Sequence, residues 1–377
     1  MKIKRTAKSK HAQFEFPTPM YFIAKLVSTY PFLGRAINRT ESTFMQKRIK
    51  KTSIIKPTYI TGIARAGTTV MLEMLSQHPD VATHKYMHMV LPYAPRFVAK
   101  IADYLPIMTK PTERMHKDGL VVTRDSPEAV EEIFWQRYFD NAMDESKSNI
   151  LDATTSNPKF EAFYKEHLKK LIVYQHATRY VAKNNYNVTR MEYLQKLFSD
   201  VRFILMIRNP FNHIASLSKQ DALFTELEGN DPRLLDWTKI IGHREFGTAR
   251  VCINPGDDAV VNKVRELWEN PQTYAQAWAI YWDAIYSLVD QKLNTNSRLA
   301  KAVLIVRYED LCNSPSEQID RIISHLELDA NRFKDIKSHY VGELKPPSYY
   351  RTKYSDEEQD AIIRITHDTA KKFGYEL

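Results

Sequence analysis

Apolar runs alternate along the chain with longer amphipathic stretches, and this pattern predicts strands that alternate with helices. Short runs rich in apolar, β-branched and aromatic residues predict buried strands at residues 57–61, 179–183, 201–207 and 302–307. Apolar residues spaced three or four positions apart predict helices at residues 128–139, 159–175, 212–219, 274–288, 316–326 and 356–372. This alternation favours a parallel sheet with right-handed crossovers. We therefore expect an α/β fold with a central parallel sheet flanked by helices.

The same pattern divides the chain into a lead-in and one domain. Residues 1–50 are expected to be a basic tail and a helical lead-in, and residues 51–377 a single domain. Two insertions are expected in that domain. Residues 84–150 contain five prolines and no recognisable parallel strand, and residues 223–270 are rich in Gly, Asn, Asp and Pro and are expected to be irregular.

The first expected strand leads into a loop with the spacing of a phosphate-binding loop. Residues 62–69 read Gly-Ile-Ala-Arg-Ala-Gly-Thr-Thr and fit the pattern G-x-x-x-x-G-x-[ST]. Backbone N–H groups at such a turn, together with the N-terminus of the next helix, attract phosphate. Thr68 stands where a nucleotide triphosphatase needs lysine, and Arg65 supplies a positive charge inside the loop.

A second strand-to-helix turn carries another cation. The apolar run at residues 201–207 ends at Arg208, where a nucleotide triphosphatase places an acidic ligand for Mg²⁺. Ser216 follows eight residues later, about two helical turns on. An arginine at the strand end and a serine on the next helix can grip one phosphate together.

These motifs, in this order, resemble those of the sulfotransferases that use 3′-phosphoadenosine 5′-phosphosulfate (PAPS). The resemblance spans roughly residues 55–330 and includes His-Pro-Asp-Val at residues 78–81 and Val-Arg-Tyr-Glu-Asp-Leu at residues 306–311. It implies a three-layer fold like that of the P-loop nucleotide triphosphatases, with helical and loop insertions, and PAPS as the sulfuryl donor. Further segments resemble a bacterial branch of the family.

The resemblance also implies roles for individual residues. The 5′-phosphosulfate is expected at Arg65, Ala66, Gly67, Thr68 and Thr69, and the 3′-phosphate at Arg208 and Ser216. Many relatives carry serine where this chain has Ala66, which removes a hydroxyl group but keeps the backbone N–H groups.

Sulfuryl transfer needs cations at the departing phosphate and a base for the acceptor's proton. Arg65, inside the loop, can supply a cation at the departing phosphate. The resemblance implies that Lys183 is a second cation, which faces the transferring group. For the base we prefer Glu132, by its likeness to the paired-glutamate stretch of heparan N-sulfotransferases. His116, beside Asp118, is the rival, because histidine is the commonest general base.

Other histidines offer weaker alternatives. His84 and His88 follow the phosphate-loop helix and stay open as bases, whereas His243 with Glu245 is expected to be a structural or lid element. The His and Cys spacings match no zinc pattern, so no metal is expected.

The charge and composition of the chain indicate which partners and which cellular compartment to expect. The net charge of +9 suits an anionic donor, and no nucleic-acid-binding motif accompanies it. Two cysteines, Cys252 and Cys312, give no disulfide framework, and no long apolar stretch predicts a transmembrane helix, so we expect a cytoplasmic protein. The basic N-terminus leaves peripheral contact with an anionic membrane open, although a tail followed by a packing helix is preferred. The oligomeric state is left open.

Two other functions compete with a PAPS-dependent sulfotransferase that modifies a hydroxyl or amine. A P-loop-type kinase or nucleotide triphosphatase needs a lysine at Thr68 and an acidic metal ligand, a role for which Asp152 is the one candidate. A non-catalytic nucleotide-binding protein is the other alternative, and the intact set of Arg65, Arg208 and Ser216 argues against it. The acceptor is expected to be a carbohydrate or another polar metabolite, by resemblance to bacterial relatives.

Overall fold

Five parallel strands form the centre of the molecule. The computed structural model describes residues 18–104, 111–345 and 354–377. The sheet has the order β2-β5-β1-β6-β7, and its strands are β1 (Thr58–Thr61), β2 (Val81–Ala82), β5 (Arg179–Lys183), β6 (Arg202–Ile207) and β7 (Val303–Arg307). A separate antiparallel hairpin consists of β3 (Thr112–Glu113) and β4 (Val121–Val122). The predicted α/β fold with a central parallel sheet is confirmed.

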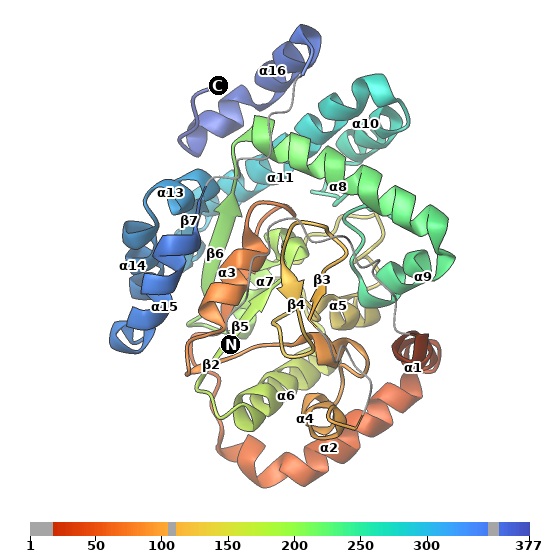
Figure 1. Cartoon of the computed structure of the whole chain (residues 1–377), viewed down its shortest axis with the longest axis vertical. Helices are drawn as coiled ribbons and strands as arrows, with labels where there is room; N and C mark the ends of the chain where they lie inside the picture. Colours follow the sequence, from red (N-terminus) through yellow and green to blue (C-terminus); the bar gives the residue numbers. More distant parts are fainter. Residues whose placement is uncertain (1–17, 105–110, 346–353) are drawn as a thin grey trace.

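Helices cover both faces of this sheet (Figure 1). Before β6, they are α1 (Thr18–Thr29), α2 (Pro31–Lys51), α3 (Thr68–Leu75), α4 (Pro95–Ile101), α5 (Glu132–Tyr138), α6 (Pro158–Tyr174) and α7 (Met191–Leu197). After β6, they are α8 (Pro210–Asn230), α9 (Pro232–Ile241), α10 (Asp258–Trp268), α11 (Tyr274–Thr295), α12 (Ser297–Ala302), α13 (Tyr308–Asn313), α14 (Pro315–Leu326), α15 (Ala330–Glu343) and α16 (Asp356–Lys372). Short 3-10 helices lie at Tyr86–Met89, Asn185–Thr189 and Pro271–Thr273.

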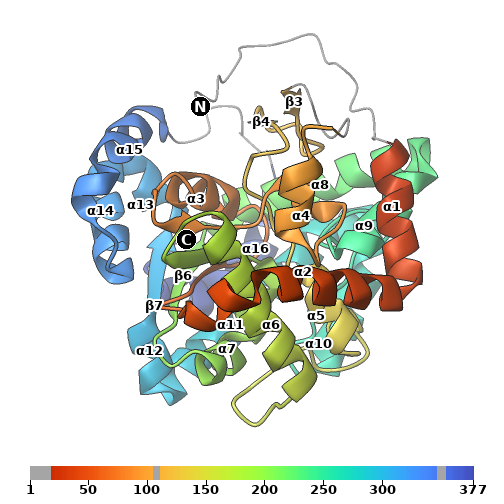
Figure 2. The ribbon, with the colours of Figure 1, turned by 90° about the horizontal axis from the view of Figure 1, so that it is seen from below.

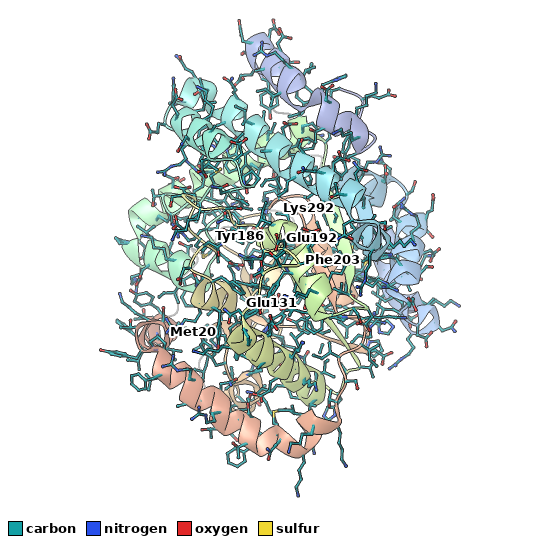
Figure 3. All side chains as sticks on the ribbon, turned by 180° about the vertical axis from the view of Figure 1, so that it is seen from behind. Met20, Glu131, Tyr186, Glu192, Phe203 and Lys292 are labelled. Atoms are coloured by element: carbon teal, nitrogen blue, oxygen red, sulfur yellow. The ribbon has the colours of Figure 1, made fainter. Side chains whose placement is uncertain are left out.

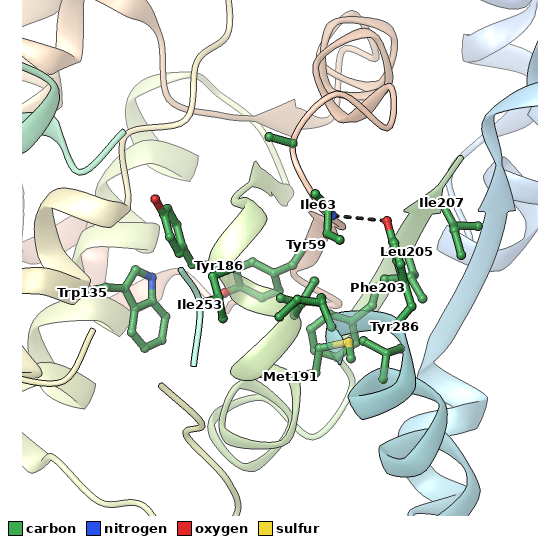
Figure 4. Close-up of a cluster of buried hydrophobic side chains, with 14 of the residues drawn as sticks. Tyr59, Ile63, Trp135, Tyr186, Met191, Phe203, Leu205, Ile207, Ile253 and Tyr286 are labelled. Atoms are coloured by element: carbon green, nitrogen blue, oxygen red, sulfur yellow. Dashed lines mark hydrogen bonds between the residues drawn. The ribbon is translucent and has the colours of Figure 1, made fainter. Parts of the chain in front are cut away.

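The strands separate two hydrophobic cores because successive side chains point to opposite faces of a sheet. Tyr59 and Phe203 belong to the larger core, which includes side chains of α6, α8 and α11 (Figure 4). Ile60 and Ile204, their neighbours in the sequence, belong to the smaller core with side chains of α3 and α14. Burial on both faces explains why these strands are nearly continuous apolar runs.

A buried carboxyl group lies among tyrosines at the edge of the larger core. Glu131 accepts hydrogen bonds from the hydroxyls of Tyr164 and of Tyr180, the latter at 2.8 Å. Burial raises the pKa of Glu131 to about 7. Figure 3 shows Glu131 in the interior, whereas Met20 of α1 lies at the periphery. The same view places Glu192 beside Lys292, whose ammonium donates to it at 2.7 Å and ties α7 to α11.

The structure corrects the prediction that residues 223–270 are irregular. Helix α8 continues to Asn230, and α9 and α10 fill most of the rest. Asp231 accepts a hydrogen bond from the backbone N–H of Arg233, and Asp257 accepts two from the first turn of α10. The Asp and Pro residues that suggested loops are therefore helix caps and first-turn residues. The helix expected at residues 128–139 is also shorter, because it forms only from Glu132 to Tyr138.

The expected helical lead-in consists of α1 and α2, which meet at Pro31 and lie along one edge of the molecule (Figures 1 and 2). The basic tail at residues 1–17 lies outside the described residues.

Candidate active site

The loop from Gly62 to Gly67 joins β1 to α3 in a backbone conformation that needs glycine at two positions. Gly62 has φ +136° and Gly67 has φ +93°. A Cβ on Gly62 would lie 2.2 Å from the carbonyl oxygen of Met206, and one on Gly67 would lie 2.6 Å from the ring of Tyr308. Arg65 itself has φ +73°. The loop is therefore wedged between β6 and the end of β7, and its turn directs it into the N-terminus of α3.

Helices behind the loop fix its backbone. Trp282 Nε1 donates to His213 Nδ1 at 3.2 Å, so the other ring nitrogen of His213 carries the proton that it donates to the carbonyl of Ala64 at 2.8 Å. Burial lowers the pKa of His213 to about 3, which keeps this ring neutral. Tyr286 accepts from the backbone N–H of Ile63 at 3.3 Å (Figure 4) and donates to the carbonyl of Met206 at 3.0 Å.

The structure brings Arg65, Arg208 and Ser216 together. Arg65 Nε lies 3.4 Å from Ser216 Oγ, and Arg208 Nη1 donates to the Arg65 carbonyl at 3.2 Å. The Arg208 guanidinium lies 5.0 Å from the ring centre of Tyr308. Its Nε is buried and has no hydrogen-bond partner among the described residues. Arg208 therefore holds a buried hydrogen-bond donor that is unsatisfied among the described residues, as expected of a guanidinium built to meet an anion.

The β3–β4 hairpin adds an arginine and a carboxylate to the loop. Arg114 Nη1 donates to Thr69 Oγ1 at 3.3 Å, and Arg114 Nε donates to Asp118 at 2.9 Å. Asp118 also accepts from Arg65 Nη1 at 3.0 Å. Burial alone would raise the pKa of Asp118, but the guanidiniums of Arg114 and Arg65 hold it well below its usual range. The contact of Arg114 with the loop was not predicted from the sequence, because no local motif ties Arg114 to the loop.

Lys183 reaches the same edge of the sheet from β5. Its backbone is paired with Ile60 of β1, so both strands end beside the loop. Burial lowers the pKa of Lys183, and the carboxylates of Glu245 and Glu128 oppose that shift. Asn185, two residues on, lies with its side-chain oxygen 3.4 Å from the hydroxyl of Thr68.

His116 lies in the β3–β4 hairpin, between Arg114, which contacts Thr69, and Asp118, which contacts Arg65. Its ring packs on Phe224 and Phe246, with centroids 5.0 and 6.3 Å away. Its Nδ1 is buried and has no hydrogen-bond partner among the described residues. Burial, followed by the charges of Arg114 and Arg65, lowers the pKa of His116 well below its ordinary value. The imidazole is therefore neutral and one ring nitrogen is not engaged.

Glu132 has a different environment. Both of its carboxylate oxygens accept from Arg190, at 2.7 and 2.9 Å, and one also accepts from Asn184 at 2.7 Å. The side chains of Glu132 and Arg190 are almost fully buried. This bidentate pair joins α5 to the segment that follows Lys183, so Glu132 positions the end of β5.

The remaining candidates have partners elsewhere. His84 Nε2 lies 3.1 Å from His167 Nε2, and the Tyr174 hydroxyl lies 2.8 Å from His88 Nε2. Both rings belong to a buried aromatic cluster beside α6. His243 lies 2.9 Å from the carbonyl of Ala129, which fits the structural role expected for it.

The residues at the loop can be compared with known proteins. The model described as the sulfotransferase family matches residues 57–246, about half of the chain, from just before β1 to beyond α9. The chain belongs to the sulfotransferase family. The matched range contains all the residues assigned above to the donor and to the base.

Solved structures of this family share the fold. This sulfotransferase is similar to sulfotransferase STF9 from Mycobacterium avium, with a TM-score of 0.54, 14% identity, and coverage of 98% of this chain and 99% of that chain. It is also similar to sulfotransferase STF1 from Mycobacterium tuberculosis H37Rv, with a TM-score of 0.53, 12% identity, and coverage of 94% and 86%. At these identities the likeness establishes the architecture alone. No curated protein sequence matches the chain.

Membership supports sulfuryl transfer as the general reaction of this sulfotransferase. Within the described residues, no cluster of three or more His, Cys, Asp or Glu side chains suits a metal ion. Over the same residues, no helix is both long and apolar enough to cross a bilayer.

Proposed function

We propose that this protein transfers a sulfuryl group from PAPS to a hydroxyl or amine of a carbohydrate or another polar metabolite. The observation that carries this proposal is the meeting of Arg65, Arg208 and Ser216 at one turn. Three polar groups that are separate in the sequence converge there on a loop that leads directly into the N-terminus of α3. Such a cradle suits a nucleotide with phosphates at two positions.

The residues present fit this donor. Arg208 Nε is buried and unpartnered among the described residues, and no acidic side chain of that part of the chain forms an ion pair with Arg208. A buried guanidinium without a carboxylate is stable only when an anion or other acceptors reach it. Arg208 and Ser216 would hold the 3′-phosphate, whereas the backbone of Ala66 and Gly67 and the hydroxyls of Thr68 and Thr69 would hold the 5′-phosphosulfate.

When bound, PAPS supplies an activated sulfuryl group whose departing phosphate gains negative charge. Arg65 and Lys183 would stabilise that charge, because both lie where β1 and β5 end. Thr69 would be oriented by Arg114, which donates to its hydroxyl at 3.3 Å. The protein would thus act mainly by positioning and electrostatic stabilisation.

The acceptor's proton needs a base, and the environments of the two candidates differ. We assign this role to His116, because its ring is neutral and has one unengaged nitrogen beside Arg65 and Arg114. Glu132, the candidate preferred from the sequence, is occupied by three hydrogen bonds from Arg190 and Asn184. We assign Glu132 to positioning the end of β5, and the kinetics of variants of both residues distinguish the two roles.

The role of Arg208 can be tested by binding measurements. We expect Arg208→Ala to weaken binding of 3′-phosphoadenosine 5′-phosphate about tenfold to a hundredfold, because charge-assisted hydrogen bonds contribute about 1.5–3 kcal/mol. Binding of adenosine 5′-phosphate, which lacks the 3′-phosphate, should change little. Isothermal titration calorimetry of both nucleotides checks this, and equal losses for both would remove the 3′-phosphate from Arg208.

A kinase or nucleotide triphosphatase is the alternative enzyme class, and chelation separates it from a sulfotransferase. Arg208 stands where those enzymes carry an acidic Mg²⁺ ligand at the strand end. We therefore expect sulfuryl transfer from PAPS to persist in EDTA. Activity that disappears with EDTA and returns with Mg²⁺ would favour the alternative, as would a larger thermal shift with ATP than with PAPS.

The state of the two cysteines bears on the cellular compartment. Cys252 and Cys312 are buried and neither forms a disulfide, and we propose the cytoplasm as the compartment.

A non-catalytic nucleotide-binding protein would bind PAPS but transfer nothing. A panel of sugars, alcohols and amines incubated with labelled PAPS distinguishes that outcome, because a sulfated product appears only if the protein is catalytic.

A further inference from the structure

The positive charge of this chain is concentrated at its N-terminal end. Residues 1–51 contain twelve Lys and Arg residues and two acidic residues, so this segment carries +10. The rest of the chain contains 42 basic and 43 acidic residues and is nearly neutral. The net charge of +9 therefore belongs to the lead-in, not to the domain that contains the donor site.

The one acidic residue of α1 and α2 does not offset this charge at the surface. Glu41 is fully buried, its carboxylate lies 3.6 Å from the ammonium of Lys170, and it also accepts from the backbone N–H of Phe97 at 2.8 Å. In contrast, Arg35, Arg39 and Lys47 are exposed. All the charged side chains exposed on these two helices are therefore cations.

Helix α1 and the start of α2 also expose apolar side chains that a water-facing helix does not need. Phe22 and Leu26 of α1 are 60% and 51% exposed, Tyr30 between the helices is 49% exposed, and Phe32 of α2 is 57% exposed. We name these four residues the apolar ridge. The opposite side of α1 is packed, since Tyr21 and Ala24 join a hydrophobic cluster with Trp237. The ridge is thus not part of the core, and a contiguous exposed apolar surface marks an interaction site.

The basic side chains continue from the ridge along α2. Phe32, Arg35, Arg39, Lys47 and Lys50 lie within about 60° of one line along the helix, at about 100° per residue. We name the last four of them the basic stripe. Figure 2 shows α1 and α2 meeting at a corner on the periphery, with α2 crossing the front of the view. The ring of Tyr30 lies 6.1 Å from that of Phe32 at this corner.

We propose that α1 and α2 dock this protein on the surface of an anionic lipid bilayer. Exposed aromatic and aliphatic side chains beside lysine and arginine are the two components of interfacial binding, because the former enter the headgroup boundary and the latter attract anionic lipids. Nucleic acid would account for the basic stripe but not for Phe22 and Leu26. Self-association would account for the ridge, but the basic stripes of two copies would repel each other.

Vesicle flotation with the full-length protein tests this proposal. The protein should bind vesicles that contain phosphatidylserine and bind weakly to vesicles of phosphatidylcholine alone. Phe22→Ser with Phe32→Ser should lower the partition coefficient at least about tenfold, because each ring loses a favourable transfer into the interface. Arg35→Gln with Arg39→Gln should lower it by about the same factor and reduce its dependence on salt.

Matched controls lie elsewhere on the surface. Ile55 is 48% exposed and Val341 36%, so Ile55→Ser with Val341→Ser removes exposed apolar groups without touching the ridge. Lys301→Gln with Lys334→Gln removes two exposed charges of other helices. Both control variants should bind vesicles like the parent protein, and all variants should keep its melting temperature, since every substituted side chain is exposed.

Several outcomes would overturn the proposal. Equal binding to neutral and anionic vesicles would remove the role of the basic stripe, and equal losses in the control variants would remove the specificity of the surface. A dimer in light scattering that Phe32→Ser dissolves, without vesicle binding by the parent, would identify the ridge as a contact between copies. Tight binding of a DNA duplex that is insensitive to Phe22→Ser, again without vesicle binding, would identify a nucleic-acid surface.

Discussion

Arg65→Gln is expected to lower kcat for sulfuryl transfer about 10²–10³-fold while the protein remains folded. A preorganised donor at a site of developing charge is worth about this much, because the surroundings exclude water and no reorganisation is needed. Arg65 is held in place from both sides, with Ser216 at 3.4 Å and Asp118 at 3.0 Å. Glutamine keeps a polar side chain in this position and removes the charge.

Steady-state kinetics with labelled PAPS measures this effect, and calorimetry with 3′-phosphoadenosine 5′-phosphate separates it from binding. The loss should be larger in kcat than in nucleotide affinity, since the charge on the departing phosphate grows only during transfer. Arg364→Gln, at an exposed position on α16, is the matched control and should change neither kcat nor nucleotide affinity. A normal kcat with reduced affinity would make Arg65 a binding residue without a role in the transition state.

His116→Gln is expected to lower kcat by about 10²–10⁴-fold, the usual contribution of a positioned general base. Because burial and two neighbouring guanidiniums lower the pKa of His116, its neutral form persists below the ordinary histidine range. In the parent protein, kcat should therefore fall only on the acid side of pH 6.5, the reference value for histidine. That acid limb should disappear in the variant.

Glu132→Gln should differ in kind from His116→Gln. It breaks the bidentate pair with Arg190, and leaving one charge of a buried pair costs about 3–5 kcal/mol of stability. We expect a clear drop in melting temperature, whereas the acid limb of the kcat profile should persist in whatever protein remains folded. His339→Gln, at an exposed position on α15, is the histidine control.

The opposite result would restore the assignment made from the sequence. If Glu132→Gln lowers kcat by the larger factor without loss of stability, and His116→Gln is nearly normal, then Glu132 is the base. Two variants with near-normal kcat would exclude both residues, and the base would then be another group near the loop.

The elements that were predicted best are those whose signal is local. The strand at Arg179–Lys183 and the final helix at Asp356–Lys372 have the predicted bounds. A short apolar run between two charged residues defines the strand, and a capping box at Ser355 marks the start of the helix. Residues 223–270 were predicted wrongly because their local signal is ambiguous. Asp, Asn and Pro punctuate loops and helix starts alike, and the choice depends on what the next turn packs against.

The site was predictable where its residues share a motif and not where contacts join distant segments. The meeting of Arg65, Arg208 and Ser216 could be predicted because the motif spacing places these residues at strand ends and on the helix that follows, whereas their proposed roles come from the family resemblance. Arg114 contacts Thr69 across 45 positions of sequence, and Arg190 contacts Glu132 across 58. Tertiary packing brings these residues together, so no motif or hydrophobic periodicity in the sequence indicates the contacts.

The carboxylate that the β3–β4 hairpin inserts between Arg65 and Arg114 bears on how fast the protein turns over. Under the proposed function, the phosphosulfate of the donor would compete with Asp118 for Arg65, so part of its attraction would go into weakening an existing ion pair. Asp118 would then return to the two guanidiniums when the nucleotide product departs. A competing carboxylate of this kind would weaken the binding of donor and product alike, and it would favour release of the product.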